Sequence, residues 1–272
     1  MKQPKSFDFQ LQNNIAQITL NRPEVFNAVT FDVYREMTDL FAELSSDNEV
    51  RVVTITGKGK AFCSGGDVRD IIGPLLERGE SELRKFTQLT CDLVWNMRML
   101  PVPIIASLNG VTAGAGAMIA IASDFRLASD FAKIAFLFVR VGLSGADMGA
   151  CYILPKIVGL TKAAELLMTG DFITAGEAYR IGLYNKVFPP EQLEQATLTL
   201  AQQLSEGPAT GLAVTKKQIN EESLPGLKDA LEAEATVQAH CMLHPDFREG
   251  FTAFTEKRKP SFQKRRDSME SK

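Results

Sequence analysis

Apolar and polar residues follow two different spacings in the first part of the chain. Over residues 15–20 polar residues separate the apolar ones, which predicts a strand that ends at a turn over 21–23. Over 31–44 the apolar residues recur near helical spacing, which predicts an amphipathic helix. The compact β-branched run 52–56 predicts a buried strand. Strands and helices therefore mix from the start, as in an α/β protein.

Further elements are expected before the C-terminal part of the chain. Residues 81–100 are periodic and contain no proline or glycine, so they predict a long helix that stops before Pro101. The others are a buried helix at 117–122 and short strands at 104–108, 124–128 and 133–138.

After residue 190 we expect only helices, separated by prolines and glycines. Their ranges are 191–206, 209–222, 227–243 and 246–255. We therefore predict an α/β core over 1–190, a helical region over 191–256 that assembles the oligomer, and a charged tail over 257–272. The tail is expected to be solvated, in preference to acting as a nucleic-acid-binding arm.

Composition narrows the class of protein. The chain has 272 residues, 45% of them hydrophobic, which is enough to bury a large core. Its net charge of −3 argues against a general nucleic-acid-binding protein. No apolar run approaches the roughly 18 residues of a membrane span, and the N-terminal residues lack the apolar centre of a signal peptide. We therefore expect a cytoplasmic protein that binds neither nucleic acid nor a membrane.

The cysteines and histidines do not predict a metal site. The cysteines are scattered and include no C-x-x-C pair: Cys63, Cys91, Cys151 and Cys241. We expect them to be reduced thiols. The histidines, His240 and His244, have no cysteine pair beside them that could complete a structural zinc site.

Two glycine-rich turns give the clearest indication of chemistry. They are AFCSGGD at 61–67 and NGVTAGAGAM at 109–118. Each follows a strand-like run and opens a segment with helical character, so each can aim backbone N–H groups at a common point. Two such donors on one carbonyl oxygen would stabilise negative charge that develops there during a reaction. The pattern predicts an enzyme that acts on activated acyl groups.

These turns belong to a set of segments that resembles the enoyl-CoA hydratase/isomerase (crotonase) superfamily over nearly the whole chain. The other segments are NRPEVFNAVT at 21–30, the stretch 103–128, LMTGDFITAGEAYRIGLYNKV at 167–187 and EGFTAFTEKRKPSF at 249–262. The resemblance implies a spiral of repeated strand–strand–helix units, with C-terminal helices that assemble trimers, often paired into hexamers. It also implies an acyl-CoA thioester substrate and an oxyanion held by two backbone amides. No metal or redox cofactor is implied, since coenzyme A enters as part of the substrate.

By this resemblance the two oxyanion-hole amides fall on Gly66 and Ala115. Both lie near expected helix starts, where unpaired N–H groups and the helix dipole favour negative charge. Many relatives have glycine at the position of Ala115, and alanine disfavours a positive φ. The simpler interpretation, that the glycines of both motifs only form tight turns, stays open.

Other residues fall where members of the family contact coenzyme A. The resemblance implies backbone contacts with adenine at Ser64. It also implies cations near the nucleotide and its phosphates, at Lys60, Arg69 and Lys257. A solvated surface charge is the alternative for each cation. Asp67 is grouped with these binding residues, although a helix N-cap is the favoured role for it.

The chain departs from typical hydratases, which use two glutamates. The resemblance places Met118 and Phe138 at those positions, and neither side chain transfers protons. Both would enlarge the apolar part of the acyl pocket, which suits a bulky, aromatic or alicyclic acyl group. Simple filling of the core is the alternative for both residues.

Asp147 is the remaining carboxylate near the expected pocket. It lies in GLSGADMGACYILP, which resembles the segment of dienoyl-CoA isomerases where an aspartate transfers protons. Apolar surroundings would raise its pKa and make it a better acid or base near neutral pH. The N-cap of a helix starting at Met148 is the competing role. An ion pair with Arg140 would instead lower the pKa of Asp147.

The leading hypothesis is an acyl-CoA enzyme that moves a proton through a thioester enolate. The simplest such enzyme is a double-bond isomerase, and hydration through Asp147 stays open. Thioester hydrolysis, decarboxylation and dehalogenation are alternatives within the family. A non-catalytic protein that binds acyl-CoA or RNA is the alternative from a different class.

Overall fold

The computed structural model describes residues 3–221 and 226–263. Its strands form a six-stranded sheet in the order β1-β2-β3-β5-β7-β10 and a four-stranded sheet in the order β4-β6-β8-β9. Pairing is parallel except between β1 and β2 and between β8 and β9. The strands are β1 Asp8–Gln12, β2 Ile15–Leu20, β3 Val52–Gly57, β4 Ala61–Cys63, β5 Ile104–Leu108, β6 Val111–Ala113, β7 Phe125–Ser129, β8 Lys133–Ala135, β9 Ile173–Thr174 and β10 Lys186–Phe188.

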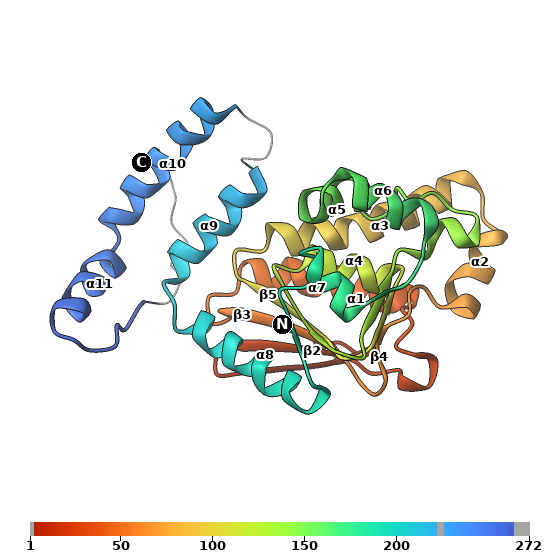
Figure 1. Cartoon of the computed structure of the whole chain (residues 1–272), viewed down its shortest axis with the longest axis horizontal. Helices are drawn as coiled ribbons and strands as arrows, with labels where there is room; N and C mark the ends of the chain where they lie inside the picture. The colour runs from red at the N-terminus through yellow and green to blue at the C-terminus, as the bar shows by residue number, and fades with distance from the viewer. Residues whose placement is uncertain (1–2, 222–225, 264–272) are drawn as a thin grey trace.

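Helices connect the strands and then continue alone towards the C-terminus (Figure 1). The α-helices are α1 Phe31–Ser45, α2 Gly73–Leu76, α3 Glu80–Met99, α4 Ala115–Ala122, α5 Ala150–Val158, α6 Leu160–Thr169, α7 Ala175–Arg180, α8 Pro190–Ser205, α9 Ala209–Glu221, α10 Leu227–Leu243 and α11 Pro245–Thr255. Short 3₁₀ or π segments are η1 Pro23–Val25, η2 Val68–Ile72 and η3 Leu137–Val141. In the part of the chain that the structure covers, we find no helix with the length and apolarity of a membrane span.

Successive pairs of strands build both sheets at once. In each pair the first strand joins the six-stranded sheet and the second joins the four-stranded sheet, as with β3 and β4, β5 and β6, and β7 and β8. A helical segment follows each pair before the next pair begins. This repeat confirms the predicted α/β spiral. It also brings the ends of β4, β6 and β8 to one edge of the small sheet, because these strands are parallel neighbours.

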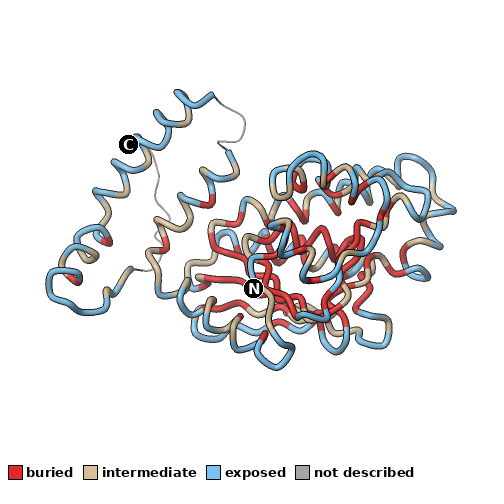
Figure 2. Tube along the Cα trace, viewed as in Figure 1, coloured by how far each residue is buried: buried red, intermediate tan, exposed pale blue. Residues whose placement is uncertain are grey.

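Helices cover both faces of the large sheet (Figure 1). On one face α8 contributes Leu193 and Ala201 to a cluster with Ile15, Val52 and Ile105 of the strands. On the other face every residue of α4 is buried. Figure 2 shows the buried trace concentrated between the sheets and these helices, while α10 is largely exposed. Covering on both faces explains why the inner strands appear in the sequence as continuous apolar runs.

Two expected elements differ from the structure. The strand expected over 133–138 is wrong beyond Ala135, because the chain there turns into the 3₁₀ segment η3. The helical region expected from residue 191 begins with α8, which packs on the sheet and so shares the hydrophobic core. Only α9, α10 and α11 extend to the side of the core (Figure 1). Most of the expected charged tail, 264–272, lies outside the described residues.

A buried lysine fastens α9 to the core. Lys216 Nζ lies 2.8 Å from Asp124 Oδ2 and donates to the carbonyl oxygens of Met97 and Val102, each at 3.1 Å. The carboxylate of Asp124 also accepts from the backbone N–H of Ile104 at 2.8 Å. Burial lowers the pKa of Lys216, and the negative charge of Asp124 opposes that shift. Asn220 of α9 also donates to the carbonyl of Arg98 at 2.7 Å, so the buried ion pair and hydrogen bonds to α3 together position α9.

Replacing Lys216 with methionine should lower the free energy of unfolding by about 3–5 kcal/mol, because Asp124 would lose a buried partner. Chemical denaturation at a fixed protein concentration measures this. The adjacent Lys217 is exposed, so Lys217→Met should change the free energy by no more than about 0.5 kcal/mol. Equal effects of the two substitutions would show that the buried contacts do not hold α9.

Candidate active site

The two glycine-rich turns lie against each other. A Cβ added at Gly65 would lie 3.4 Å from the carbonyl oxygen of Ala113 and 3.8 Å from the backbone nitrogen of Ala115. A Cβ added at Gly114 would lie 3.4 Å from the Cα of Gly65. Both glycines have left-handed φ angles, +112° and +50°. The two turns lie 48 residues apart in the sequence, as Gly66 and Gly114 do, and their main chains are neighbours in space.

The first turn holds Gly66 between two anchored neighbours. The N–H of Val29 donates to the carbonyl of Gly65, and the N–H of Asp67 donates to the carbonyl of Val29, both at 2.9 Å. This is a parallel bridge between Val29 and Gly66. In such a bridge the central residue turns its own N–H and C=O away from its partner. Within the described chain, the Gly66 N–H has no acceptor.

The second turn ends where α4 begins. Ala115 is the first residue of α4, so its N–H lacks an intrahelical acceptor and lies at the positive end of the helix dipole. The left-handed residue is Gly114, and Ala115 is not among the residues with positive φ. The sequence-based concern about alanine at this position is therefore wrong. A Cβ at Gly116 would lie 2.4 Å from the carbonyl oxygen of Cys63, so α4 starts directly against β4.

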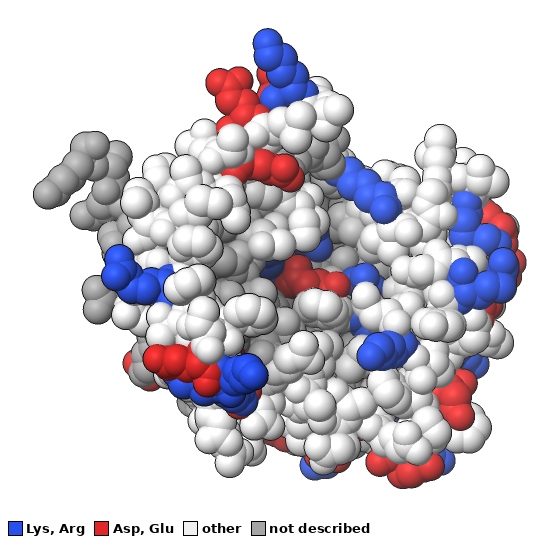
Figure 3. Space-filling view, turned by 60° about the vertical axis from the view of Figure 1, so that its left-hand side comes forward, with Lys and Arg blue, Asp and Glu red and all other residues white. Residues whose placement is uncertain are grey.

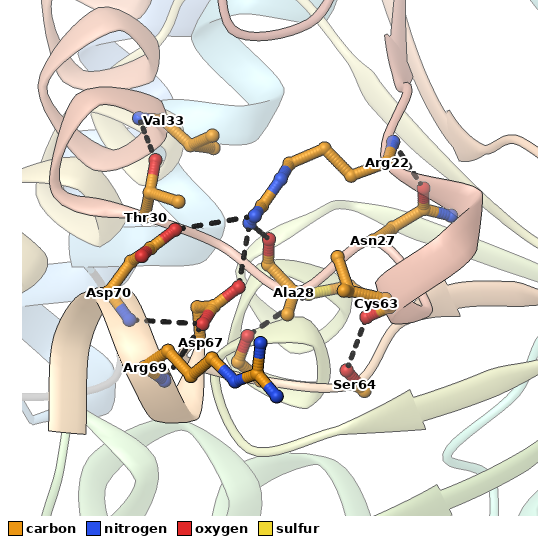
Figure 4. Close-up of polar contacts among 12 residues, drawn as sticks. Arg22, Asn27, Ala28, Thr30, Val33, Cys63, Ser64, Asp67, Arg69 and Asp70 are labelled. Atoms are coloured by element: carbon orange, nitrogen blue, oxygen red, sulfur yellow. Dashed lines mark hydrogen bonds and ion pairs between the residues drawn. The ribbon is translucent and has the colours of Figure 1, made fainter. Parts of the chain in front are cut away.

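The carboxylate of Asp67 forms hydrogen bonds with other residues of the chain (Figure 4). Its Oδ1 accepts from the backbone N–H groups of Arg69 and Asp70, at 2.9 and 3.1 Å, and caps η2. Its Oδ2 accepts from Arg22 at 2.9 Å. The hydrogen bond from Asp70 is the main cause that lowers the pKa of Asp67. The N-cap expected from the sequence is confirmed, and the contacts of this carboxylate are internal.

The remaining coenzyme A candidates lie around the first turn or far from it. Ser64 donates its hydroxyl to the carbonyl of Val25 at 3.4 Å. Lys60 and Arg69 flank the same turn and are exposed. Lys257 is exposed after the end of α11, on the C-terminal helices. Three of the four candidates thus surround one loop, and the fourth belongs to a separate part of the fold.

Cys63 is the last residue of β4 and lies directly before the first turn. It is fully buried, and its Sγ lies 3.9 Å from the carbonyl oxygen of Gly65. Burial raises the pKa of this thiol to about 12. Cys63 is therefore a protonated packing residue. Among the described residues, no three His, Cys, Asp or Glu side chains group in a way that could hold a metal ion.

Asp147 is half-buried in the segment that follows β8 and η3. Burial raises its pKa, and a hydrogen bond from the backbone of Met148 partly opposes the shift. The expected role as an N-cap is wrong: α5 starts at Ala150, its N-cap is Gly149, and no side chain caps it. Met148 and Gly149, with φ of 47° and 84°, separate the carboxylate from the helix.

Arg140, whose pairing with Asp147 the sequence left open, pairs with a different carboxylate. The guanidinium of Arg140 forms an ion pair with the exposed carboxylate of Asp171 and donates to the carbonyl of Thr169 at 3.1 Å. No ion pair joins Arg140 to Asp147 in the described chain. The pKa of Asp147 is therefore governed by burial.

Tyr34 is a residue of this region that the sequence analysis placed only on the apolar face of a helix. Its ring is buried and packs edge-on against Phe86, with centroids 5.6 Å apart. Burial raises its pKa well above the usual value, and Cys63 and Asp147 add to the shift. The sequence feature that could have identified Tyr34 is a tyrosine on the otherwise apolar face of the helix over 31–44.

Met118 and Phe138 are both buried. Met118 lies inside α4 and Phe138 in η3, and both belong to the main hydrophobic cluster together with Met148. This burial agrees with the core-filling interpretation of both residues.

A separate groove of about 760 Å³ runs between α3, α5 and α9. Figure 3 shows a hollow on this side of the molecule, with acidic and basic side chains at its floor. The groove is lined mainly by apolar side chains, and its charged lining residues are Arg98, Asp124, Arg126, Lys156 and Lys216. Gly66 and Ala115 do not line it, but Met148 does. The groove therefore passes beside Asp147 without containing the two free amides.

Comparisons with known proteins place this chain among proteins of similar sequence and fold. A family model described as enoyl-CoA hydratase/isomerase matches residues 10–265. Trans-2-decenoyl-[acyl-carrier-protein] isomerase of Streptococcus mutans is 32% identical over 95% of this chain and 98% of its own. 1,2-Epoxyphenylacetyl-CoA isomerase of Escherichia coli is 32% identical over 93% and 96%. A solved structure from Streptomyces coelicolor A3(2), described as a candidate enoyl-CoA hydratase, has a TM-score of 0.94 and 45% identity over 96% and 95%.

Two glycines of the site should respond differently to a methyl group. At Gly116 the added carbon meets the Cys63 carbonyl at 2.4 Å, so Gly116→Ala should destabilise the protein by about 1–3 kcal/mol. At Gly66 the nearest atom is 3.6 Å away, so Gly66→Ala should leave the melting temperature near that of the wild type. Thermal unfolding followed by circular dichroism compares them. A larger loss at Gly66 would contradict the described contacts.

Proposed function

The chain belongs to the enoyl-CoA hydratase/isomerase family, and we propose that it isomerises a carbon–carbon double bond of an acyl-CoA thioester through an enolate. The observation that carries this proposal is the contact between the two glycine-rich turns. Each turn offers one backbone N–H without an acceptor in the described chain, at Gly66 and at Ala115.

In the proposed reaction the thioester carbonyl oxygen accepts a hydrogen bond from both amides. The Asp147 carboxylate removes a proton from the carbon beside the conjugated system, and the electron pair moves onto the carbonyl oxygen as an enolate. The same proton, now on Asp147, is returned to the other end of the system while the oxygen gives its charge back. Nothing is oxidised or reduced, and no metal or redox cofactor is required. Two preorganised donors stabilise the charge where it develops.

Isomerisation is favoured over hydration by the residues at the positions of the two hydratase glutamates. The family resemblance puts Met118 and Phe138 where hydratases have their glutamates, and both are buried apolar side chains here. Typical hydratases use that glutamate pair to hold and activate water, and neither side chain here can take over this role. Two of the similar proteins carry isomerase names, for a decenoyl thioester and for an epoxyphenylacetyl thioester. Both names fit a bulky acyl group in an apolar pocket.

Hydration through Asp147 alone is the second candidate, because other similar proteins are named hydratases. No described residue favours hydrolysis, decarboxylation or dehalogenation over proton transfer. We also propose that coenzyme A lies along the first turn. Ser64 would offer backbone contacts there, and Lys60 and Arg69 would face the phosphates. Lys257 would reach the nucleotide from the C-terminal helices.

We further propose that α10 and α11 join copies of the chain into a trimer or a pair of trimers. None of the residues of α10 is buried. α11 exposes three phenylalanines, Phe247, Phe251 and Phe254, by 58%, 67% and 84%. An isolated helix of this length gains little stability from its own hydrogen bonds and needs a packing partner. Exposed aromatic side chains on the neighbouring helix provide a matching surface.

Asp147→Asn tests the proposed proton transfer. We expect it to slow exchange of the α-protons of hexanoyl-CoA with heavy water by about 10²- to 10⁴-fold. Nuclear magnetic resonance follows this exchange, and calorimetry should show unchanged binding of the thioester. The exposed Asp130 provides the control, since Asp130→Asn should not alter the rate. Full exchange by the Asp147 variant would overturn the assignment of the base.

The pH dependence gives an independent test of the same carboxylate. A base must be ionised, so the exchange rate should fall as the pH drops through the pKa of Asp147. Because burial raises that pKa, the fall should be centred above the ordinary aspartate value of 3.8. A rate that stays constant down to that value would contradict the desolvated environment.

The assembly is tested by charge on α11. The double substitution Phe251→Asp and Phe254→Asp should shift the protein from trimer or hexamer to smaller species in sedimentation velocity experiments, since buried carboxylates oppose association. Phe131 is 78% exposed and lies outside the C-terminal helices, so Phe131→Asp is the matched control. A wild-type protein that sediments as a monomer would refute the proposed assembly.

A further inference from the structure

Arg22 connects three parts of the first turn (Figure 4). One nitrogen of its guanidinium donates to the carbonyl of Ala28 at 2.8 Å and to Oδ2 of Asp67 at 2.9 Å. The other nitrogen donates to Oδ2 of Asp70 at 3.4 Å. The side chain is 27% exposed, so part of it remains in contact with solvent. A planar guanidinium suits such simultaneous contacts better than an ammonium group does.

The segment that carries Arg22 holds the turn along its whole length. The N–H of Ser64 donates to the carbonyl of Phe26 at 3.0 Å. Three residues later in the same segment, the N–H of Val29 donates to the carbonyl of Gly65, and the carbonyl of Val29 accepts from the N–H of Asp67. The peptide planes before and after Gly66 are therefore both held by this one segment. The direction of the Gly66 N–H depends on where the segment lies.

The same segment adopts an unfavourable backbone shape. Phe26 and Asn27 have φ of 54° and 56°, a left-handed region that costs energy for residues other than glycine. The Asn27 side chain supports this shape: its Oδ1 accepts from the N–H of Arg22 at 2.9 Å, and its Nδ2 donates to the carbonyl of Ala61 at 2.8 Å. A strained segment that is held so firmly indicates a requirement for its particular geometry.

Asp67 alone would work against the oxyanion. Its carboxylate belongs to the residue next to Gly66, and its pKa is lowered, so it is ionised at neutral pH. A negative charge beside the proposed oxyanion would repel the charge that develops there. The ion pair with Arg22 compensates that charge. Arg22 therefore has two effects on the first amide, one geometric and one electrostatic.

We propose that Arg22 is a positioning residue for catalysis, which aims the Gly66 amide through Val29 and Asp67 and compensates the charge of Asp67 without touching the substrate. This inference rests on the proposed function, because it requires that the Gly66 amide binds the thioester oxygen. A residue that only braces the fold, which we call a structural brace, would affect stability alone. Arg22 as a positioning residue would also determine how strongly the bound carbonyl is polarised.

The test compares Arg22→Gln and Arg22→Lys with the wild type, with Arg35→Gln as the matched control. Arg35 is exposed on α1 and forms an ion pair with Asp32, at 2.9 Å. The probe is hexanoyl-CoA with an isotope label in its carbonyl, studied by difference infrared spectroscopy. Binding to the wild type should move the carbonyl stretch to lower frequency. Arg22→Gln should bind the probe with similar affinity but show a smaller shift.

The rate of α-proton exchange should fall about 10- to 100-fold in Arg22→Gln, as expected for a misaligned donor. Millimolar methylguanidinium should restore part of the rate, because the native guanidinium is partly open to solvent. Arg22→Lys keeps the charge and should retain more activity than Arg22→Gln, and this variant serves if the glutamine protein does not fold. Arg35→Gln should show the exchange rate and the carbonyl shift of the wild type.

Wild-type values of both the carbonyl shift and the exchange rate in Arg22→Gln would overturn the proposal. So would a lower melting temperature with an unchanged carbonyl shift, which is the result expected of a brace. A wild-type protein that shows no carbonyl shift would instead refute the proposed function itself. The two failures are therefore distinguishable in the same experiment.

Discussion

Contact between two main chains is the constraint from which the site follows. β4 and β6 are parallel neighbours, with Ala61 opposite Val111 and Cys63 opposite Thr112. Because their carboxyl ends lie at one edge of the small sheet, the turns after them meet there. Gly116 then permits α4 to begin directly against the carbonyl of Cys63. The register of a short sheet thus determines where two free amides lie.

Successive turns of the spiral carry the different groups of the proposed site. The turn after β4 carries Gly66, the turn after β6 carries Ala115, and the longer segment after β8 carries Asp147. Main-chain donors come from the parts with the closest packing, and the titratable group comes from a segment with left-handed residues beside it. This division suits an enzyme in which the amides must be rigid and the carboxylate must approach carbon atoms.

The sequence predicted the long, regular elements well and the short ones poorly. The strand over 104–108 and the helix over 227–243 have the expected bounds, since each is uniform in pattern and ends at proline or glycine. β4, β6 and β9 span two or three residues, too few for any periodicity to appear. Helical spacing alone also could not show that α8 is covered by the chain's own sheet. That distinction depends on tertiary packing.

The candidate site shows the same limits. Glycine patterns and family resemblance located both turns, because main-chain shape is encoded locally by glycine. The competing role of Asp147 as a cap followed from its place before a helix, but α5 begins only after Met148 and Gly149. The sequence did not identify Arg22 and Tyr34 as residues of the candidate site. Their importance arises from contacts with residues distant in sequence, which no local pattern reveals.

The state of Cys63 determines how this protein would respond to oxidants and alkylating agents. Its thiol is enclosed between β4 and α4, and a pKa of about 12 leaves almost no thiolate at neutral pH. Electrophiles would react first with the exposed Cys91 and Cys151. Peroxide or iodoacetamide would therefore modify these two thiols before Cys63. Cys91 lies close enough to Asp147 for that carboxylate to raise its pKa, so its modification would reach the surroundings of Asp147, whereas the turn that carries the first amide would stay unmodified.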